Sequence, residues 1–457
     1  MRCSTEQAER LAQALRFRTV TLPPGTTRAD PSYAPFASLL AFLRSSFPRA
    51  AEALRWEELG DLALLLTWEA RAGAAETKAL PVLLYAHFDV VPPGDESAWR
   101  HGAFSGDVAE GFVWGRGALD DKHCLLGILE AVESLLAEGR GPEVTVYMAF
   151  GGDEETVGTG ARLIADTLAA RGVRLSCVLD EGSVISDGIV PLVRVPLALV
   201  GVAEKGFANA EMTVRGSAGH SSTPGRGTAA GALAAVVAAV ERRRFPLRLT
   251  GTTVGTLRAL GPHLPGLRGG ALRAIRLLWP FVRRSLGAVP VLDALLRTTQ
   301  AVTILRAGDK ENVLPAEARA VVNLRLLPGD SPESAVGRIH QVAHRALRGP
   351  FSLEVRLLPG ATASPPVPET RPDPWLWDAL CAAIRQAEPR AAIVPTLVVV
   401  YTDSRKFASL SASIVRFHPL VLTAEERGSI HSINERISLE NYGRMIAFYR
   451  SILLAAP

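Results

Sequence analysis

Short apolar runs alternate with longer amphipathic stretches over the first 204 residues of the chain. The short runs have roughly the five to eight residues of a buried strand, and the longer stretches repeat their apolar residues at helical spacing. We expect strands at 62–68, 81–86, 143–150 and 176–180, and helices at 122–138 and 158–171. Strands that alternate with helices predict an α/β domain around a mostly parallel sheet.

The pattern changes at residue 206, where a strictly alternating run begins. We expect strands at 207–216, 298–308, 318–329 and 352–360, and helices at 227–243 and 332–347. Two helices beside a small antiparallel sheet form a compact α+β unit. After a proline-rich linker at 361–374 the α/β pattern resumes. The sequence therefore predicts an α/β domain made of residues 1–204 and 361–457, with an α+β domain inserted at 205–360.

The most apolar later region is 275–296, within a stretch at 267–296 that is rich in Leu, Ile, Val, Phe and Trp. Pro280, Arg283 and Arg284 interrupt it, so we expect no uninterrupted transmembrane segment there. Three interpretations stay open: the segment lies on a lipid surface, lines an apolar pocket, or forms a pair of helices packed onto their own domain.

The composition is that of an ordinary globular protein, with 48% hydrophobic and 21% charged residues in a chain of 457. Lys and Arg are scattered and leave a net charge of +4, so nothing favours a nucleic-acid partner. The first 17 residues lack the continuous apolar core of a signal peptide. The four cysteines lie far apart, and their spacing predicts neither a disulfide framework nor a thiolate zinc site; they are Cys3, Cys124, Cys177 and Cys381.

His87 and Asp120 are the first candidate metal ligands. His87 follows an apolar run, and functional groups in open α/β sheets gather at the carboxyl ends of strands. An imidazole nitrogen binds zinc, and Asp89, two residues later, is placed to accept the other ring N–H. Asp120 follows a turn with glycines at 115 and 117, and its two oxygens are able to bridge two cations. A structural histidine and an N-capping aspartate are the alternatives.

Further acids and a late histidine complete the set. Asp153, Glu154 and Glu155 are consecutive, and three adjacent acids repel one another unless cations or solvent offset the repulsion. Asp180 ends the run 176–180, and His431 has a possible supporting carboxylate in H-S-I-N-E at 431–435. A solvated acidic turn and a simple turn residue are the alternatives for the acids. Taken together, carboxylates and imidazoles after several strands favour a di-metal centre, with Zn²⁺ preferred over Mn²⁺ or Co²⁺.

These motifs extend over nearly the whole chain: HFDVVP (87–92), GRGALDDK (115–122), LDEGS (179–183), EKG (204–206), GHSS (219–222), RTTQAVTILRAGDKENVLP (297–315), TDSR (402–405) and H-x-x-N-E (431–435). The pattern resembles the aminoacylase and carboxypeptidase family of di-zinc metallopeptidases, and within it the N-fatty-acyl-amino-acid synthase/hydrolases and the carboxypeptidase S-like enzymes. The resemblance implies two Zn²⁺ ions per subunit. His87 and Asp180 would bind one ion and Glu155 and His431 the other, with Asp120 bridging them; a cis peptide would join Asp120 to Asp121.

The resemblance also assigns residues to catalysis and to substrate binding. Glu154 would be the general base, and Asp89 would support the site. His220, in an inserted lid and dimerisation domain, would reach the partner subunit's active site and stabilise the oxyanion. The implied substrate-binding residues are Asn312, Arg325, Thr402, Ser404 and Arg405. From the residues alone, a locally bonded His220, a buried ion pair at Arg325 and a polar turn at 402–405 stay open.

The implied reaction is the zinc-dependent, reversible hydrolysis and condensation of N-acyl amino acids, above all N-fatty-acyl amino acids, with a metal-bridging hydroxide as the nucleophile. The segment 267–296 would then line a groove for a long acyl chain. The alternative reaction is that of a carboxypeptidase or dipeptidase, which cleaves peptides with a free C-terminal carboxylate. A non-catalytic binding protein of the same fold is disfavoured by the intact ligand set.

The resemblance further implies a homodimer, contact with a lipoprotein or lipid surface, and secretion. The sequence departs from this pattern in two ways. No export signal is recognised, and Tyr401 stands where a smaller or amide residue is expected. The first departure concerns location, and the second concerns the width of the substrate pocket.

Overall fold

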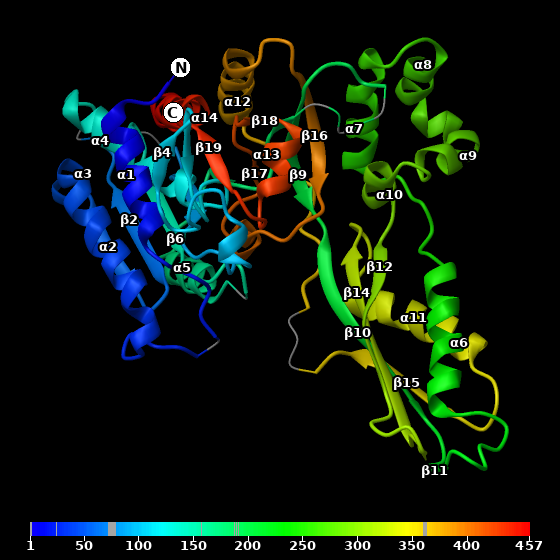
Figure 1. Ribbon diagram of the computed structural model, residues 1–457. Coiled ribbons are helices and arrows are strands. Elements are labelled where there is room, and N and C mark those ends of the chain that lie inside the picture. The colour runs from blue at the N-terminus through cyan, green and yellow to red at the C-terminus, as the bar shows by residue number, and fades with distance from the viewer. Residues whose placement is uncertain are drawn as a thin grey trace.

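The computed structural model describes residues 2–23, 25–71, 79–156, 158–186, 188, 190, 192–359 and 363–457. Its central element is a large sheet with the strand order β1–β2–β6–β3–β7–β17–β9–β8–β18, and β16 also pairs with β9 (Figure 1). The strands are β1 Arg55–Leu59, β2 Ala63–Trp68, β3 Val82–His87, β6 Val146–Gly151, β7 Cys177–Asp180, β8 Ile185–Ser186, β9 Leu197–Glu204, β16 Ala392–Val398, β17 Ile414–Arg416 and β18 Val421–Leu422.

The middle of this sheet is parallel: β6, β3, β7 and β17 run in the same direction. β1 and β2 add an antiparallel margin at one side, and β9 is antiparallel to both β17 and β8 at the other. The α/β class and the mostly parallel central sheet predicted from the sequence are therefore confirmed. Because β6, β3 and β7 are neighbours in parallel, the residues that follow them emerge at one edge of the sheet.

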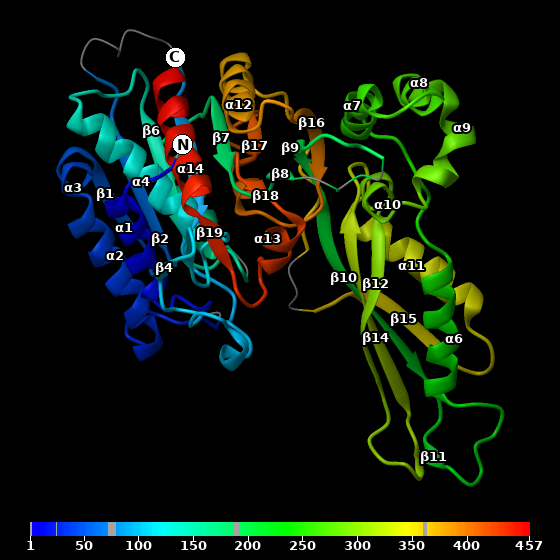
Figure 2. The same cartoon turned by 45° about the horizontal axis from the view of Figure 1, so that its top comes forward.

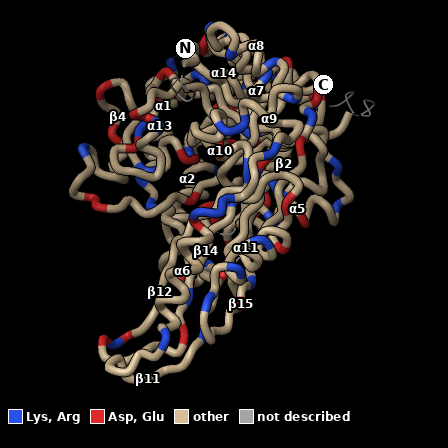
Figure 3. Tube along the Cα trace, turned by 90° about the vertical axis from the view of Figure 1, so that its right-hand side faces the viewer, with Lys and Arg blue, Asp and Glu red and all other residues tan. Residues whose placement is uncertain are grey.

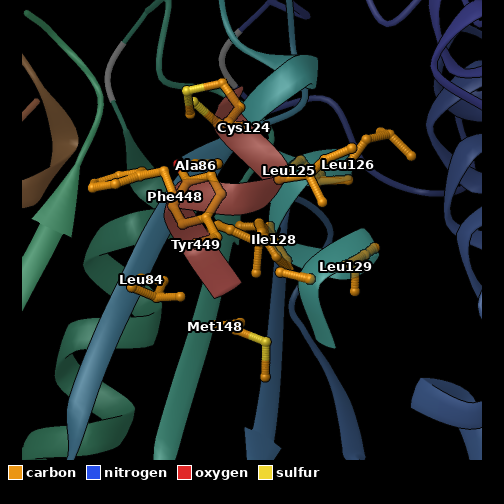
Figure 4. Close-up of a cluster of buried hydrophobic side chains, with 14 of the residues drawn as sticks. Leu84, Ala86, Cys124, Leu125, Leu126, Ile128, Leu129, Met148, Phe448 and Tyr449 are labelled. Atoms are coloured by element: carbon orange, nitrogen blue, oxygen red, sulfur yellow. The ribbon is translucent and has the colours of Figure 1, made fainter. Parts of the chain in front are cut away.

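Helices cover both faces of the sheet (Figures 1 and 2). One face packs against α1 Thr5–Arg16, α2 Ala34–Ser46, α4 Lys122–Ala137, α12 Pro374–Ala387 and α14 Leu439–Ala455, and the other packs against α5 Thr159–Ala170. Alternate strand residues supply the two cores, since side chains in a strand point to opposite faces. Leu84 and Ala86 lie in the first core with Met148, Ile128 and Tyr449 (Figure 4), whereas Leu83 and Tyr85 lie in the second.

A second sheet, of four antiparallel strands in the order β12–β14–β10–β15, has its own hydrophobic core. Its strands are β10 Gly206–Arg215, β12 Thr299–Ala307, β14 Glu317–Leu326 and β15 Ser352–Leu357, and its helices are α6 Ala229–Arg242 and α11 Pro332–Ala346. The short pair β11 Gly219–His220 and β13 Val313–Leu314 lies at the end of this unit remote from the large sheet (Figure 1). The predicted strands and helices of the insertion all occur, whereas the predicted boundary at 360/361 lies outside the described residues.

The apolar segment 267–296 and the residues before it form four helices: α7 Gly251–Leu260, α8 Leu267–Arg273, α9 Ile275–Leu286 and α10 Pro290–Leu296. Within the predicted insertion, they pack on the large sheet, where Val254, Leu257 and Leu292 share a core with Leu197 of β9 and Val394 of β16. The segment therefore contributes more than a pair of helices. Its packing supports the interpretation that part of it lines an apolar pocket.

Within the described residues, none of the helices is both long and apolar enough to cross a membrane. Basic and acidic residues are interspersed along the trace (Figure 3).

Candidate metal centre and active-site cleft

His87 is the last residue of β3, and its ring is buried. Nδ1 lies 3.1 Å from the backbone oxygen of Asp89 and 3.3 Å from Asp89 Oδ1. Both oxygens of Asp89 also accept backbone N–H groups, from Glu154 and Glu155, at 3.1 Å each. Asp89 therefore ties the end of β3 to the turn after β6. With Nδ1 occupied in this way, Nε2 of His87 is left to face a metal ion.

Asp120 lies between two histidines. Its Oδ1 is 2.8 Å from Nε2 of His87, and its Oδ2 is 2.9 Å from Nε2 of His431. Nε2 of His431 also lies 3.0 Å from Oε1 of Glu155. The Asp120–Asp121 peptide is cis, as the sequence resemblance implied. One carboxylate facing two imidazoles through separate oxygens is the arrangement expected of a bridging ligand.

Glu435 holds the turn that carries Asp120. Its Oε1 accepts the backbone N–H groups of Gly117 at 3.1 Å, Leu119 at 2.7 Å and Asp120 at 3.2 Å, while Oε2 pairs with the buried Arg116. Gly117 has a φ of +89°, which few other residues adopt. The motif H-S-I-N-E indicated Glu435 as a support for His431, but the contacts of Glu435 are with the Asp120 turn. His431 itself has a φ of +59°, a strained value of the kind found at functional sites.

Asp180 is the buried last residue of β7, the strand next to β3. Its Oδ1 accepts the backbone N–H of Glu181 at 2.8 Å, and its Oδ2 accepts that of Ser404 at 3.0 Å. In the described residues, the ligand atoms of His87, Asp120 and Glu155 lie within 4.8 Å of one another. His431 joins this group through its contacts with Asp120 and Glu155, whereas Asp180 stands beside it at the neighbouring strand end.

The electrostatics of the cluster favour positive charge. Hydrogen bonds with Asp120 and Glu155 raise the pKa of His431 to about 10. Burial acts to lower the pKa of His87, yet its bonds with Asp120 and Asp89 raise it well above the usual value. Burial, together with the negative charges of neighbouring carboxylates such as Glu155, raises the pKa of Glu154 well above its usual range. Because the carboxylates stabilise cationic histidines, they would equally stabilise a divalent cation, and this set of nitrogen and oxygen donors fits Zn²⁺.

A cleft of about 410 Å³ opens beside the cluster. Its lining combines Glu154, Glu155, Thr156 and His431 with Val400, Tyr401, Phe207 and Arg325. Arg325 comes from β14 of the second sheet, and its guanidinium lies 4.9 Å from the ring centre of Phe207. Across the described ranges, no carboxylate forms an ion pair with Arg325, so the buried ion pair left open from the sequence is not observed. A cation at the wall of a metal cleft is suited to a substrate carboxylate.

Of the other predicted substrate-binding residues, Thr402 and Arg405 contact Glu204, and Ser404 lies beside Thr402. Thr402 donates its hydroxyl to Glu204 at 3.0 Å, and Arg405 forms an ion pair with the same carboxylate at 2.9 Å. Ser404 contacts the Thr402 hydroxyl at 2.9 Å and, as described above, holds Asp180. These polar groups therefore meet a buried carboxylate and a candidate ligand, while the neighbouring Tyr401 lines the cleft. Their direct contact with substrate stays a prediction.

His220 and Asn312 lie together, but away from the cleft of their own chain. His220 Nδ1 is 2.7 Å from the hydroxyl of Ser222, and the backbone N–H of Ser221 donates to the carbonyl of Asn312 at 3.1 Å. Both residues are exposed at the remote end of the second sheet, where Figure 2 shows β11. The local hydrogen bond left open from the sequence is observed. A catalytic role of His220 stays a prediction.

Sequence reasoning missed the role of Glu204. It forms a second buried ion pair, with Arg416 at 2.8 Å, and through Thr402 it supports the loop that binds Asp180. The only sequence signal was the EKG motif, whose glutamate ends β9. Its partners lie about 200 residues away in the chain, so no local pattern identifies them.

The family model of peptidase family M20/M25/M40 matches residues 83–455. The chain belongs to this family. It is 32% identical over 452 residues to the probable carboxypeptidase S-like 2 of Dictyostelium discoideum. The matched region covers 98% of this chain and 84% of that relative. It is also 35% identical over 372 residues to the N-fatty-acyl-amino acid synthase/hydrolase of Homo sapiens, covering 80% and 72%.

Solved structures share the fold of this chain. An M20 family metallo-carboxypeptidase from Sulfolobus solfataricus superposes with a TM-score of 0.66 at 17% identity, covering 98% of this chain and 99% of the other. Human carnosine dipeptidase 1 gives a TM-score of 0.65 at 16% identity, with 99% and 96% covered. The predicted family and the prediction of an enzyme are thus confirmed: the chain is a member of a metal-dependent family of metallopeptidases and amidohydrolases, with candidate metal-binding residues in place.

Substitution of Glu435 by Gln is expected to weaken zinc binding about 10- to 100-fold, because the Asp120 turn loses its charged anchor and Arg116 is left unpaired. Chelator competition on the folded protein measures this affinity. Glu425→Gln is the matched control, since it breaks the exposed ion pair with Arg436, which contributes little. Equal zinc affinities in the two variants would contradict the proposed anchoring.

Proposed function

We propose that this M20 enzyme hydrolyses and re-forms the amide bond of N-acyl amino acids, with fatty-acyl groups preferred. The observation that carries the proposal is an apolar cavity of about 490 Å³ beside the metal cleft. Val400 lines both spaces, and the cavity also includes Gly182 and Ser183, which follow the candidate ligand Asp180. An acyl amide at the metal centre has an apolar space for its tail on one side and Arg325 for its carboxylate on the other.

The remaining walls of the cavity are supplied mainly by strand β9, strand β16 and the helices α7 and α10. They include Leu199, Thr256, Leu260, Leu292, Ala294, Leu295, Leu397 and Val398. Such a lining accepts a hydrocarbon chain through burial of apolar surface, at about 0.8 kcal/mol per CH₂ group. The segment 267–296 contributes to this cavity through α10, while α9 lies outside it.

In this proposal, His87 and Asp180 would hold one zinc ion, Glu155 and His431 would hold the other, and Asp120 would contribute to both. The two ions, when bound, supply the Lewis acidity that polarises the scissile carbonyl and activates water. Glu154 takes a proton from the water and delivers it to the leaving amine, and Arg325 positions the substrate carboxylate. Since an amide, its acid and its amine are in equilibrium, the same residues serve hydrolysis and condensation.

The second candidate function is that of a carboxypeptidase or dipeptidase. It is favoured by the relatives named carboxypeptidase S-like and carnosine dipeptidase, and by the same cleft, in which Arg325 suits a peptide's terminal carboxylate equally well. The two functions differ in what occupies the apolar cavity.

The ratio of kcat/KM for an N-oleoyl amino acid to that for a blocked dipeptide with the same C-terminal residue separates the two functions. We expect the zinc-loaded enzyme to prefer the oleoyl substrate. Glu154→Gln is expected to lower both values about 100- to 10,000-fold with zinc retained, because proton transfer is lost. The exposed Glu52→Gln serves as the control. A higher kcat/KM for the dipeptide would contradict the N-acyl amino acid proposal and support a carboxypeptidase or dipeptidase.

Replacement of Ala294 by Trp tests the cavity itself, because the indole would fill the space that receives the acyl tail. We expect kcat/KM for an oleoyl amino acid to fall at least about tenfold, with an acetyl amino acid nearly unaffected. The control is Ala288→Trp, the same change at an exposed position before α10. Equal losses of kcat/KM for the long and the short substrate would contradict the proposal that the cavity binds the acyl tail.

We propose further that the enzyme is a homodimer in which His220 and Asn312 complete the partner's cleft. In support, β12 is an edge strand that exposes Ile304 and Leu305, and exposed apolar edges commonly pair with another chain. His220 lies in β11, and Asn312 directly precedes β13, at the end of the second sheet remote from the large sheet (Figure 1).

Mixed dimers of two inactive variants test this arrangement. When His220→Ala and Glu154→Gln subunits are unfolded and refolded together, a mixed dimer contains one intact composite site. We expect random mixing to restore about a quarter of the wild-type activity. Either variant refolded alone is the control, and the absence of recovery in a mixture shown to contain mixed dimers would exclude a role for His220 across subunits.

Secretion and lipid contact rest on the resemblance, and we propose both on that basis. For lipid contact, α9 adds an exposed apolar surface formed by Leu277 and Phe281 with Arg276, Arg283 and Arg284 nearby. Basic residues beside exposed apolar ones suit an anionic lipid surface. Reduced flotation of Phe281→Ser with anionic vesicles would support the contact, and fractionation of the source cells would test secretion.

A further inference from the structure

Three potential metal-binding atoms meet beneath the active-site cluster. His123 and Cys124 lie in the first turn of α4, and His418 follows strand β17. Nε2 of His123 is 3.2 Å from Nδ1 of His418, and Sγ of Cys124 is 3.4 Å from the first nitrogen and 3.2 Å from the second. All three side chains are at most 3% exposed. Figure 4 shows Cys124 at the margin of the α4–α14 core.

Hydrogen bonds alone do not account for all three short contacts among His123 Nε2, Cys124 Sγ and His418 Nδ1. A neutral imidazole nitrogen either donates or accepts, and the thiol has a single proton. If His123 Nε2 donates to His418 Nδ1, the thiol proton is directed either to that acceptor or to the Asp121 carboxylate, and the contact between Nε2 and sulfur has no proton of its own. At most two of the three short contacts are therefore good hydrogen bonds. A single cation at the centre satisfies all three donors together.

Two neighbouring buried atoms also lack partners. Nδ1 of His123 and Oδ1 of Asp121 make no hydrogen bond in the described part of the chain, although they face each other at 3.8 Å. Buried polar atoms of this kind need an explanation. If Nε2 of His123 binds a metal ion, Nδ1 carries the proton and is directed towards the Asp121 carboxylate, an arrangement common around metal-bound histidines.

The distances fit a transition-metal ion. With metal–nitrogen bonds of ~2.0–2.1 Å and metal–sulfur bonds of ~2.3 Å, the ligand atoms of a tetrahedral site lie about 3.3–3.6 Å apart. The triangle is within about 0.3 Å of that geometry. Asp121 also offers an oxygen, since the ligand atoms of all four residues lie within 4.8 Å of one another. Thiolate and imidazole ligands favour Zn²⁺ over Mg²⁺ or Ca²⁺.

We propose that His123, Cys124 and His418, with Asp121, form a separate metal site that binds Zn²⁺ or a similar divalent transition metal. Binding forms the metal–sulfur bond and releases the thiol proton to solvent. The site shares no ligand with the catalytic set. It joins the start of α4, directly after Asp120, to the segment after β17, and thereby fixes the helix behind the bridging carboxylate. The wide spacing of the cysteines concealed it, because its other ligands are histidines, one of them about 290 residues away.

Cobalt substitution tests the site without reference to catalysis. The catalytic ligands contain no sulfur, so a thiolate-to-cobalt charge-transfer band in the near ultraviolet can come only from a cysteine site. We expect the cobalt-loaded wild-type protein to show this band at about one equivalent per chain, and Cys124→Ser to lose it. Cys381→Ser, in α12, is the matched control and keeps the band.

Zinc content provides the second measurement. We expect Cys124→Ser to bind about one zinc ion per chain fewer than the wild type, with the catalytic ions retained. If Cys124→Ser does not fold, the presence or absence of the charge-transfer band in the cobalt-loaded wild type tests the site without the variant. The cobalt-loaded wild type, when active but without the band, would overturn the site and leave the proposed function standing. A band in a protein that hydrolyses no amide would support the cysteine site and contradict the proposed function.

Discussion

The crowding of carboxylates at one edge of a parallel sheet is the constraint on which the rest of the structure depends. β6, β3 and β7 are parallel neighbours, so the acids after β6, His87 at the end of β3 and Asp180 at the end of β7 emerge side by side. Such a group is costly to bury without positive charge. Its hydrogen bonds raise the pKa of both histidines, which indicates that the site favours positive charge.

Buried carboxylates outside the cluster provide its rigidity. Asp89 links the ends of β3 and β6, Glu435 anchors the Asp120 turn, and Glu204 orders the loop that holds Asp180. Glu435 and Glu204 are each neutralised by buried arginine, so their cost of burial is offset by charge pairing. Asp120, Asp180 and the turn that carries Glu155 are thereby held by contacts from distant parts of the chain, as a preformed metal site requires.

The sequence predicted the strand ends well, because an apolar run followed by His87 or Asp180 is a local pattern. It also predicted the elements of the inserted sheet from their alternation. It did not predict that Glu435 supports the Asp120 turn, or that Thr402 and Arg405 enclose Glu204, since these contacts join segments about 200 to 320 residues apart. The packing of α7 to α10 on β16 was hidden for a related reason: periodicity shows which face of a helix is apolar, but not which sheet it covers.

Anomalous diffraction at the zinc edge from crystals of the zinc-loaded enzyme tests the central claim most directly, because it locates metal ions independently of activity. The account predicts one strong peak between Asp120 and His87 and another between Asp120 and His431, with the carboxylate between them. A map from active protein with only one peak near Asp120, or with none, would contradict the two-metal site.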